Sequence, residues 1–327
     1  MSLDADHIVD RRRLRRKLTF WRVTAIVVAI AAIVGGTGYS TLRGGILPGQ
    51  PGASIARITI EGLIRSSQQR VEALDRLGKS QVKAVILHIN SPGGTVAGSE
   101  QLYDSLMQLR SKKPVVVVVD GLAASGGYIA AMASDYIVAQ QSSIVGSIGV
   151  IFQYPNVAEL LKTVGVKVEE VKSSPLKAAP NGYEPTSPEA RAAIESLVMD
   201  SYAWFKGLVR DRRKLDGEAL DKVSDGRVFT GRQALPLKLI DAMGNEQTAI
   251  EWLAKEKGID PKTPVRDYRL NPRFSDLPFL HTAVIGVFEA VGLSSLARRF
   301  EEWGMLQAME RLNLDGLLAL WHPVPQR

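Results

Sequence analysis

The sequence contains no cysteine among its 327 residues. Disulfide bonds and thiolate catalysis are therefore excluded, while the redox compartment of the protein is left open. Histidine is also scarce, because the chain contains only four. They are His7 before the longest apolar run, His88 inside a strand-like apolar run, and His281 and His322 in the C-terminal region. We interpret His88 as a core or surface histidine whose hydrogen bonds are satisfied by its surroundings. The sequence therefore offers no good candidate for the histidine of a Ser-His-Asp triad.

Two other common signatures are missing from the sequence. No cluster of potential ligands has metal-site spacing, and no glycine motif of the phosphate-binding type is convincing. We therefore expect neither a metal ion nor an organic cofactor. The sequence also shows no internal repeat, and its length allows one large domain or two small ones.

The positive charge of the chain is concentrated near its start. The net charge is +7, and residues 1–22 contribute +4 of it, with seven basic and three acidic side chains. The high isoelectric point is therefore partly a property of this basic tail. It does not indicate a nucleic-acid-binding surface, and we expect no nucleic-acid partner.

Twenty uncharged residues, 23–42, follow the basic tail. A helix of about 20 residues spans about 30 Å, which is the thickness of the hydrocarbon core of a bilayer. Trp21 and Tyr39 bracket the run at interfacial positions, and the positive-inside rule keeps the preceding tail in the cytoplasm. The sequence predicts an uncleaved signal-anchor followed by a linker over residues 43–53. The alternative is a cleaved signal peptide, although the run is long for one and no clear A-x-A site follows.

The rest of the chain alternates between strand and helix patterns. Strands are expected over 55–64, 83–90, 114–119, 135–140 and 168–172, and helices over 67–78, 95–110, 157–165, 187–214 and 245–259. Residues 91–94 and the pair Asp120 and Gly121 are expected to form turns. This order predicts an α/β fold of repeated β-α-β units around a parallel sheet. A stripe on the long helix favours core packing or a subunit contact; it comprises Ile194, Val198, Tyr202, Phe205 and Val209.

Ser125 lies where a buried strand gives way to a helix that begins Gly-Gly-Tyr. Free backbone N–H groups and the positive end of the helix dipole meet at such a junction. A serine there can act as a nucleophile, and neighbouring amides can stabilise an oxyanion. The alternative is that Ser125 only caps the helix and the glycines only allow close packing.

A nucleophilic serine needs a base, and lysine is the main alternative to histidine. A lysine buried beside a serine loses the stabilisation of its charge, so its pKa falls and its neutral amine can accept the serine proton. The segment SPGG (91–94) ends the preceding strand, and parallel strands end at the same edge of a sheet. Its glycines would bring backbone amides close to a substrate carbonyl, although a plain turn is the alternative.

The segments HINSPGG (88–94) and DGLAASGGYIAAMASDYIVA (120–139) together resemble the signal peptide peptidase SppA family of serine–lysine peptidases. VGSIGVI (145–151) and DGRVFTGRQALPLKLID (225–241) match patterns of the same family. The resemblance implies a Clp protease/crotonase-like fold for a peptidase domain over residues 54–260. The single AASGG motif implies the short, single-domain type. Residues 261–327 fall outside the resemblance and form an extension of unknown role.

The resemblance also implies the roles of individual residues. Ser125 would be the nucleophile, Lys177 its base, and Ser147 the hydroxyl that orients the lysine amine. The amides of Gly94 and Gly126 would form the oxyanion hole. Lys172 is an alternative base, because the local sequence SSPLKAAP departs from the glycine-containing form usual in the family.

The function that follows is a serine endopeptidase of the bacterial inner membrane. Its catalytic domain would face the periplasmic side, and its substrates would be extended peptides from remnant signal peptides or misfolded exported proteins. Relatives imply a homo-oligomeric ring or dome. Two alternatives are a non-catalytic scaffold, which would tolerate loss of Ser125, and a crotonase-like acyl-CoA enzyme, which would not need Lys177.

Overall fold

A computed structural model describes residues 21–22, 54–270 and 317–321. The predicted anchor over 23–42 and most of the 261–327 extension lie outside these residues. Within the described ranges, no helix is both long and apolar enough to cross a membrane. The chain divides into residues 1–52 and residues 53–327, and the fold and the site belong to the second unit.

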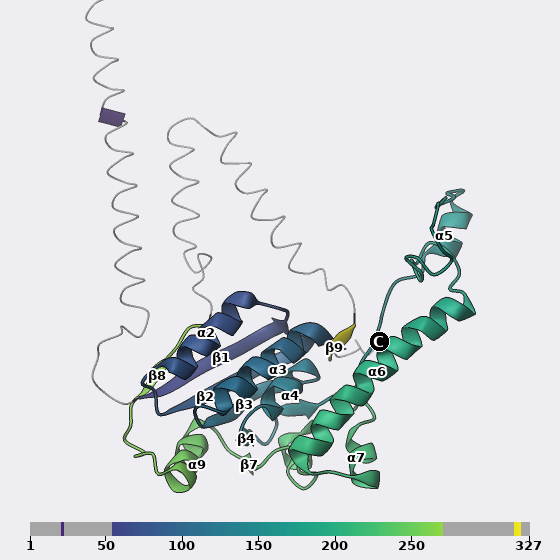
Figure 1. Cartoon of the computed structure of the whole chain (residues 1–327). Helices are drawn as coiled ribbons and strands as arrows, with labels where there is room; N and C mark the ends of the chain where they lie inside the picture. Colours follow the sequence, from purple (N-terminus) through teal and green to yellow (C-terminus); the bar gives the residue numbers. More distant parts are fainter. Residues whose placement is uncertain (1–20, 23–53, 271–316, 322–327) are drawn as a thin grey trace, which may run out of the picture. The chain divides into compact units, whose positions relative to one another are not determined.

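A nine-stranded mixed sheet lies at the centre of this unit (Figure 1). Its main path has the order β6-β5-β3-β2-β1-β8, in which β1, β2, β3 and β8 pair in parallel and β6 pairs antiparallel with β5. The strands are β1 (Ile55–Ile64), β2 (Ala84–Thr95), β3 (Val115–Ala124), β4 (Tyr136–Ala139), β5 (Ile144–Gly146), β6 (Val228–Thr230), β7 (Ala242–Met243), β8 (Val265–Asp267) and β9 (Leu318–Leu320).

Helices cover both faces of the sheet, so its central strands are buried on both sides. Ala249 and Leu253 of α9 pack against Ile86 of β2 and Val116 of β3 in one cluster. Successive residues of β2 from Ala84 to Leu87 are fully buried, as a continuous apolar run predicts. The helices are α2 (Gln68–Lys79), α3 (Val96–Arg110), α4 (Gly126–Met132), α5 (Ala158–Thr163), α6 (Pro188–Arg213), α7 (Gly217–Val223), α8 (Gly231–Ala234) and α9 (Glu246–Lys257).

Several helix starts follow from their capping residues. The side chains of Ser67, Thr95 and Ser187 accept hydrogen bonds from the first turns of α2, α3 and α6. Pro188 occupies the first turn of α6, where its missing N–H costs nothing. The apolar stripe of α6 is buried at Phe205 and Val209 but only half-buried nearer the start of the helix.

Two predicted turns and one predicted strand are wrong. Residues 91–94 and the pair Asp120 and Gly121 are not turns, because β2 continues to Thr95 and β3 continues to Ala124. Both strands bend at register shifts and keep neighbours beyond them: β2 pairs with the end of β1, and β3 pairs with β5. Residues 168–172 form no strand.

Residues 152–187, here called the arm, leave the sheet and carry α5 beyond the start of α6 (Figure 1). The two ends of the arm are joined by a hydrogen bond from the Val157 N–H to the Gly182 carbonyl, at 2.8 Å. The hydroxyls of Tyr154 and Thr186 add a second link at 2.6 Å. Large apolar side chains of the arm are exposed, namely Leu160, Val164, Val166, Val168, Val171, Leu176 and Tyr183.

Candidate active site

Ser125 joins β3 to α4 in a strained backbone conformation. Its φ of 54° and ψ of −117° are rare for a residue with a side chain, and strained residues of this kind cluster at functional sites. A sharp strand-to-helix turn is also how several hydrolases present a nucleophilic serine. Ser125 is 1% exposed and makes no side-chain capping bond, so simple helix capping does not explain it.

The helix that follows Ser125 is fixed deep in the fold. All residues of α4 are buried, and the Tyr128 hydroxyl donates to the Leu239 carbonyl at 2.7 Å. Burial raises the pKa of Tyr128, so the phenol stays protonated. The N–H groups of Tyr128 and Ile129 donate to the Ser125 carbonyl. Gly126 opens the helix, where backbone N–H groups lack intrahelical partners and are available to a ligand.

The glycines of β2 lie directly against this helix start. A Cβ built on Gly93 would be 2.8 Å from the Gly126 nitrogen, so the two glycine segments are in close contact. A Cβ built on Gly94 would be 1.8 Å from the Ile64 carbonyl oxygen, so no other residue fits there. The structure therefore brings the glycine end of β2 against the start of α4 at Gly126, and the sequence predicted that these two segments lie close together.

Ser147 lies beside Ser125 because of the pairing of β3 with β5. Ala124 pairs with Gly146, and each serine is the next residue along its own strand. The Ser125 N–H donates to the Gly146 carbonyl at 2.8 Å, which ties the two strand ends together. Ser147 also has a positive φ of 52° and is 8% exposed.

Lys177, by contrast, is an exposed residue of the arm. Its backbone N–H donates to the Ser174 carbonyl at 3.1 Å, and among the described residues its amine has no hydrogen bond or ion pair. No described contact joins it to Ser125. The structure thus gathers Ser125, Ser147, Gly94 and Gly126 and leaves Lys177 apart from them.

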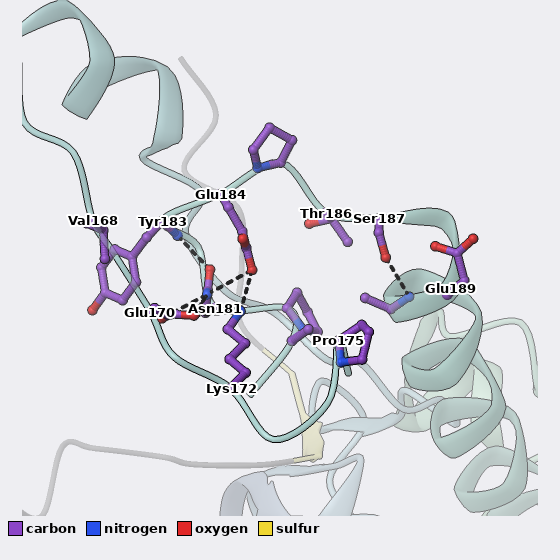
Figure 2. A pocket seen from close by; sticks show the side chains of 14 residues that line it. Val168, Glu170, Lys172, Pro175, Asn181, Tyr183, Glu184, Thr186, Ser187 and Glu189 are labelled. Atoms are coloured by element: carbon purple, nitrogen blue, oxygen red, sulfur yellow. Dashed lines mark hydrogen bonds and ion pairs between the residues drawn. The ribbon is translucent and has the colours of Figure 1, made fainter. Parts of the chain in front are cut away.

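Lys172 lies in an acidic pocket of the arm (Figure 2). Its amine is 2.5 Å from a Glu170 oxygen and 2.6 Å from a Glu184 oxygen. These contacts, first that with Glu170, raise the pKa of Lys172. Asn181 donates to both glutamates, so the two carboxylates are held around the lysine.

Two features beside the site could not be predicted from the sequence. The short strand β9 pairs with the glycine end of β2, although it lies more than two hundred residues further along the chain. The Ser99 hydroxyl donates to the Thr95 carbonyl at 2.9 Å and lies 2.2 Å from where a Gly126 Cβ would be. The apolar run 317–321 is the only signal for the first, and nothing local predicts its partner.

Within the described residues, no group of histidine and acidic side chains could hold a metal ion.

Comparison with known proteins identifies the family. Residues 107–260 match the model of peptidase family S49, and residues 59–145 match that of the Clp proteases. A protease of Synechocystis sp. is 39% identical over 209 residues, which cover 63% of this chain and 76% of that protein. The chain belongs to peptidase family S49. It has the Clp protease-like α/β fold with a mixed sheet.

Other S49 relatives carry more specific names. A signal peptide peptidase SppA of Enterococcus faecium is 29% identical, with 79% of this chain and 83% of that protein covered. Protease 4 of Salmonella typhi is 37% identical over 60% of this chain, which spans only 31% of that protein. A solved ClpP1 mutant of Listeria monocytogenes aligns with 58% of this chain and 91% of its own, at a TM-score of 0.40 and 15% identity.

Proposed function

We propose that this S49 peptidase is a serine endopeptidase with a Ser125–Lys177 dyad. The observation that carries the proposal is the strained, buried turn at Ser125, placed against the amides of two glycine segments. Such a turn presents a nucleophile next to donors that can stabilise an oxyanion. Family membership favours this chemistry over the acyl-CoA alternative.

The proposed reaction passes through an acyl-enzyme. Ser125 attacks the carbonyl carbon of a peptide bond while neutral Lys177 accepts the hydroxyl proton. The Gly94 and Gly126 amides stabilise the tetrahedral oxyanion, and Lys177 passes the proton to the leaving amine. Water then hydrolyses the ester with Lys177 as base, and Ser147 orients the lysine amine.

We place Lys177 at the Ser125 of a neighbouring subunit. Two observations support this arrangement: Lys177 is exposed on the arm, and the arm exposes a set of large apolar side chains. An apolar surface of this kind on a soluble domain marks an interaction site. A homo-oligomeric ring or dome would bury the arm and insert each lysine into the next subunit.

Lys172 is the poorer base in the arrangement described. A general base must lose its proton near neutral pH, and the contacts with Glu170 and Glu184 stabilise the charged amine instead. Its role is therefore structural, because it joins the middle of the arm to the segment at Glu184 that precedes α6.

The proposed location and substrates follow from the segments around the site. Residues 23–42 would anchor the chain in the bacterial inner membrane, with residues 1–22 in the cytoplasm and the peptidase domain over 54–260 in the periplasm. Residues 43–53 would link the two. Remnant signal peptides and misfolded exported proteins would be the substrates, because an extended peptide can pair its backbone with a strand edge.

Peptide hydrolysis by the full chain in detergent tests this function. We expect Ser125→Ala and Lys177→Ala to lose at least about a thousandfold in rate on an unstructured protein and on apolar peptides. Lys172→Ala is the matched control and should stay active. If Lys172→Ala is inactive while Lys177→Ala cleaves, the base is wrongly assigned. If an assembled wild type cleaves nothing, the scaffold alternative replaces the peptidase.

A further inference from the structure

Ser91 of β2 is packed between the two segments that would form the oxyanion hole. Its side chain is fully buried, and it pairs with Ala123 of β3, two residues before Ser125. A Cβ built on Gly127 would be 2.7 Å from the Ser91 carbonyl oxygen and 3.3 Å from the Ser91 Cβ. Ser91 therefore lies directly against the start of α4, while the glycine end of β2, residues 93 and 94, follows it along the chain.

The strands β1 and β2 change register at Ser91. Ser91 and Pro92 of β2 lie opposite the single residue Gly62 of β1. Because proline has no N–H, Pro92 cannot donate a hydrogen bond to β1. The Ser91 hydroxyl donates to the Gly62 carbonyl at 2.7 Å instead. The side chain thus supplies a donor that the backbone cannot provide at this position.

The same hydroxyl accepts a hydrogen bond from the glycine end of β2. The Gly93 N–H donates to the Ser91 oxygen at 3.1 Å. A hydroxyl has one proton, and the Gly62 carbonyl at 2.7 Å is a better acceptor for it than the Gly93 carbonyl at 3.5 Å. One buried hydroxyl therefore joins β1 to Gly93 through one donated and one accepted bond.

The position of the Gly94 amide depends on the conformation of Gly93. Gly93 has a φ of 107°, which is open mainly to glycine, and its N–H is bonded to Ser91. This agrees with the assignment of the oxyanion donor to Gly94 and not to Gly93. Oxyanion donors must lie about 2.7–3.1 Å from the developing charge, and a displacement of about 1 Å can cost about a hundredfold in rate.

We propose that Ser91 is a positioning residue for hydrolysis, because its hydroxyl holds Gly62 and Gly93 so that the Gly94 amide stays in place to stabilise the oxyanion. Ser91 acts through the backbone and not on the substrate. Without the hydroxyl, a buried carbonyl and a buried N–H both lose their partner, and the glycine end of β2 must shift to find others. The inference rests on the proposed function, since the oxyanion forms only if Ser125 attacks a peptide bond.

Steady-state peptide hydrolysis by the full chain in detergent tests the proposal with Ser91→Ala. We expect kcat to fall about tenfold to a hundredfold while KM changes less than about twofold, because stabilisation of the transition state is weakened. Ser105→Ala is the matched control. Ser105 is also buried, but its hydroxyl donates to the Gln101 carbonyl within α3 at 2.8 Å, so kcat should be unchanged. A raised KM with unchanged kcat, or equal losses in both variants, would overturn the proposal.

A peptide boronic acid gives a second measure of the oxyanion hole. It forms a tetrahedral adduct with a nucleophilic serine and so resembles the transition state. Its dissociation constant should rise in Ser91→Ala by about the factor by which kcat falls. An uncleaved peptide should bind Ser125→Ala equally well with and without Ser91→Ala. Equal losses for the boronic acid and the peptide would indicate general damage to the site and contradict a positioning role.

The Ser91→Cys variant separates hydrogen bonding from packing. A thiol fills the position without leaving a cavity, but it is only a weak donor and acceptor. This variant should therefore lose about as much kcat as Ser91→Ala, and it carries the same test if Ser91→Ala does not fold. Recovery of the wild-type rate by the cysteine variant would mean that Ser91 only fills space.

Hydrogen exchange measures the same bond without catalysis. Mass spectrometry of peptic fragments covering residues 88–96 should show faster exchange in Ser91→Ala than in the wild type or in Ser105→Ala, because the Gly93 N–H loses its acceptor. If exchange rises as expected but the wild type hydrolyses no peptide, the bond stands and the peptidase function fails. If the wild type cleaves peptides but exchange is unchanged in Ser91→Ala, the positioning role is wrong.

Discussion

Ser125 holds a backbone conformation that its own side chain disfavours. A positive φ at a residue with a Cβ costs about 1–3 kcal/mol, and the surrounding structure must maintain it. The bond from its N–H to Gly146, together with the buried helix behind it, supplies that constraint. The strain fixes the direction of the hydroxyl in advance, so no reorganisation is needed when a substrate arrives.

Ser125→Gly and Ser125→Ala should therefore differ in stability although both abolish hydrolysis. Glycine adopts a positive φ readily, so Ser125→Gly is expected to exceed Ser125→Ala in free energy of unfolding by about 1 kcal/mol. Thermal unfolding of the two variants side by side checks this. Equal stabilities would mean that the turn carries no strain.

Gly94 is a second residue whose identity the fold dictates. Gly94→Ala puts a Cβ 1.8 Å from the Ile64 carbonyl oxygen, so β1 or β2 must move and the amide of residue 94 moves with it. We expect a loss of at least about 2 kcal/mol in stability and loss of hydrolysis. Gly207→Ala in α6 is the control, because a Cβ there meets nothing within 4 Å. It should be neutral or stabilising, and similar losses in both variants would contradict the close approach.

At the scale of elements, charged side chains join α9 to the sheet. Arg57 of β1 donates to both oxygens of Glu246 at 2.6 Å, and His88 of β2 contacts Glu246 at 2.8 Å and Asp120 at 2.9 Å. The hydrogen bond from Arg57, more than that from His88, lowers the pKa of Glu246. Both ring nitrogens of His88 contact carboxylates of this network, and no described contact joins His88 to Ser125.

Glu246→Gln should lower the free energy of unfolding at pH 7 by about 2 kcal/mol, since charge-assisted bonds are lost. A carboxylate with a lowered folded pKa stabilises fully above its unfolded pKa, and this contribution disappears as pH falls through the folded value. The gap between wild type and variant should therefore shrink below about pH 4.5, the ordinary value for this carboxyl. Urea unfolding at several pH values measures it, with exposed Glu251→Gln as the control. A gap that is constant down to pH 3 would contradict the ion pair.

The helices and strands that could be predicted from the sequence are those determined by residues within the element itself. Alternating apolar residues predicted β1, and the Ser-Pro-Glu start predicted α6 within one residue. The glycines at 93 and 94, and Asp120 with Gly121, favoured turns locally, but pairing with β1 and β5 keeps both strands extended. The partner of β9 could not be predicted, because its apolar run would suit many sheet edges.

At the scale of the whole molecule, the arm exposes more large apolar side chains than any other described segment. Val171 is fully exposed, and Leu160 and Val164 are each more than 60% exposed. The sequence predicted that Ser125 and the glycines of residues 93–94 lie close together, because neighbouring parallel strands end at the same edge of a sheet. It could not place Lys177 relative to them, since in the proposed arrangement this depends on where the arm lies in the assembly.

Charged substitutions on the arm should therefore dissociate the proposed assembly. Val171→Asp combined with Leu160→Asp is expected to convert the oligomer to monomers and to reduce hydrolysis with it, because desolvating two carboxylates at an interface is costly. Light scattering after size exclusion measures the mass. Met243→Asp, an exposed apolar residue off the arm, is the control and should leave the assembly intact. An intact oligomer in the double variant would exclude the arm as the contact.

The most direct test of the account mixes two inactive variants, Ser125→Ala and Lys177→Ala, under conditions where subunits exchange. If each site takes its serine from one subunit and its lysine from the next, equal mixing should restore about a quarter of the wild-type rate, by random pairing in a symmetric ring. Mixed assemblies that form, as mass spectrometry would show, yet stay inactive would contradict a dyad shared between subunits.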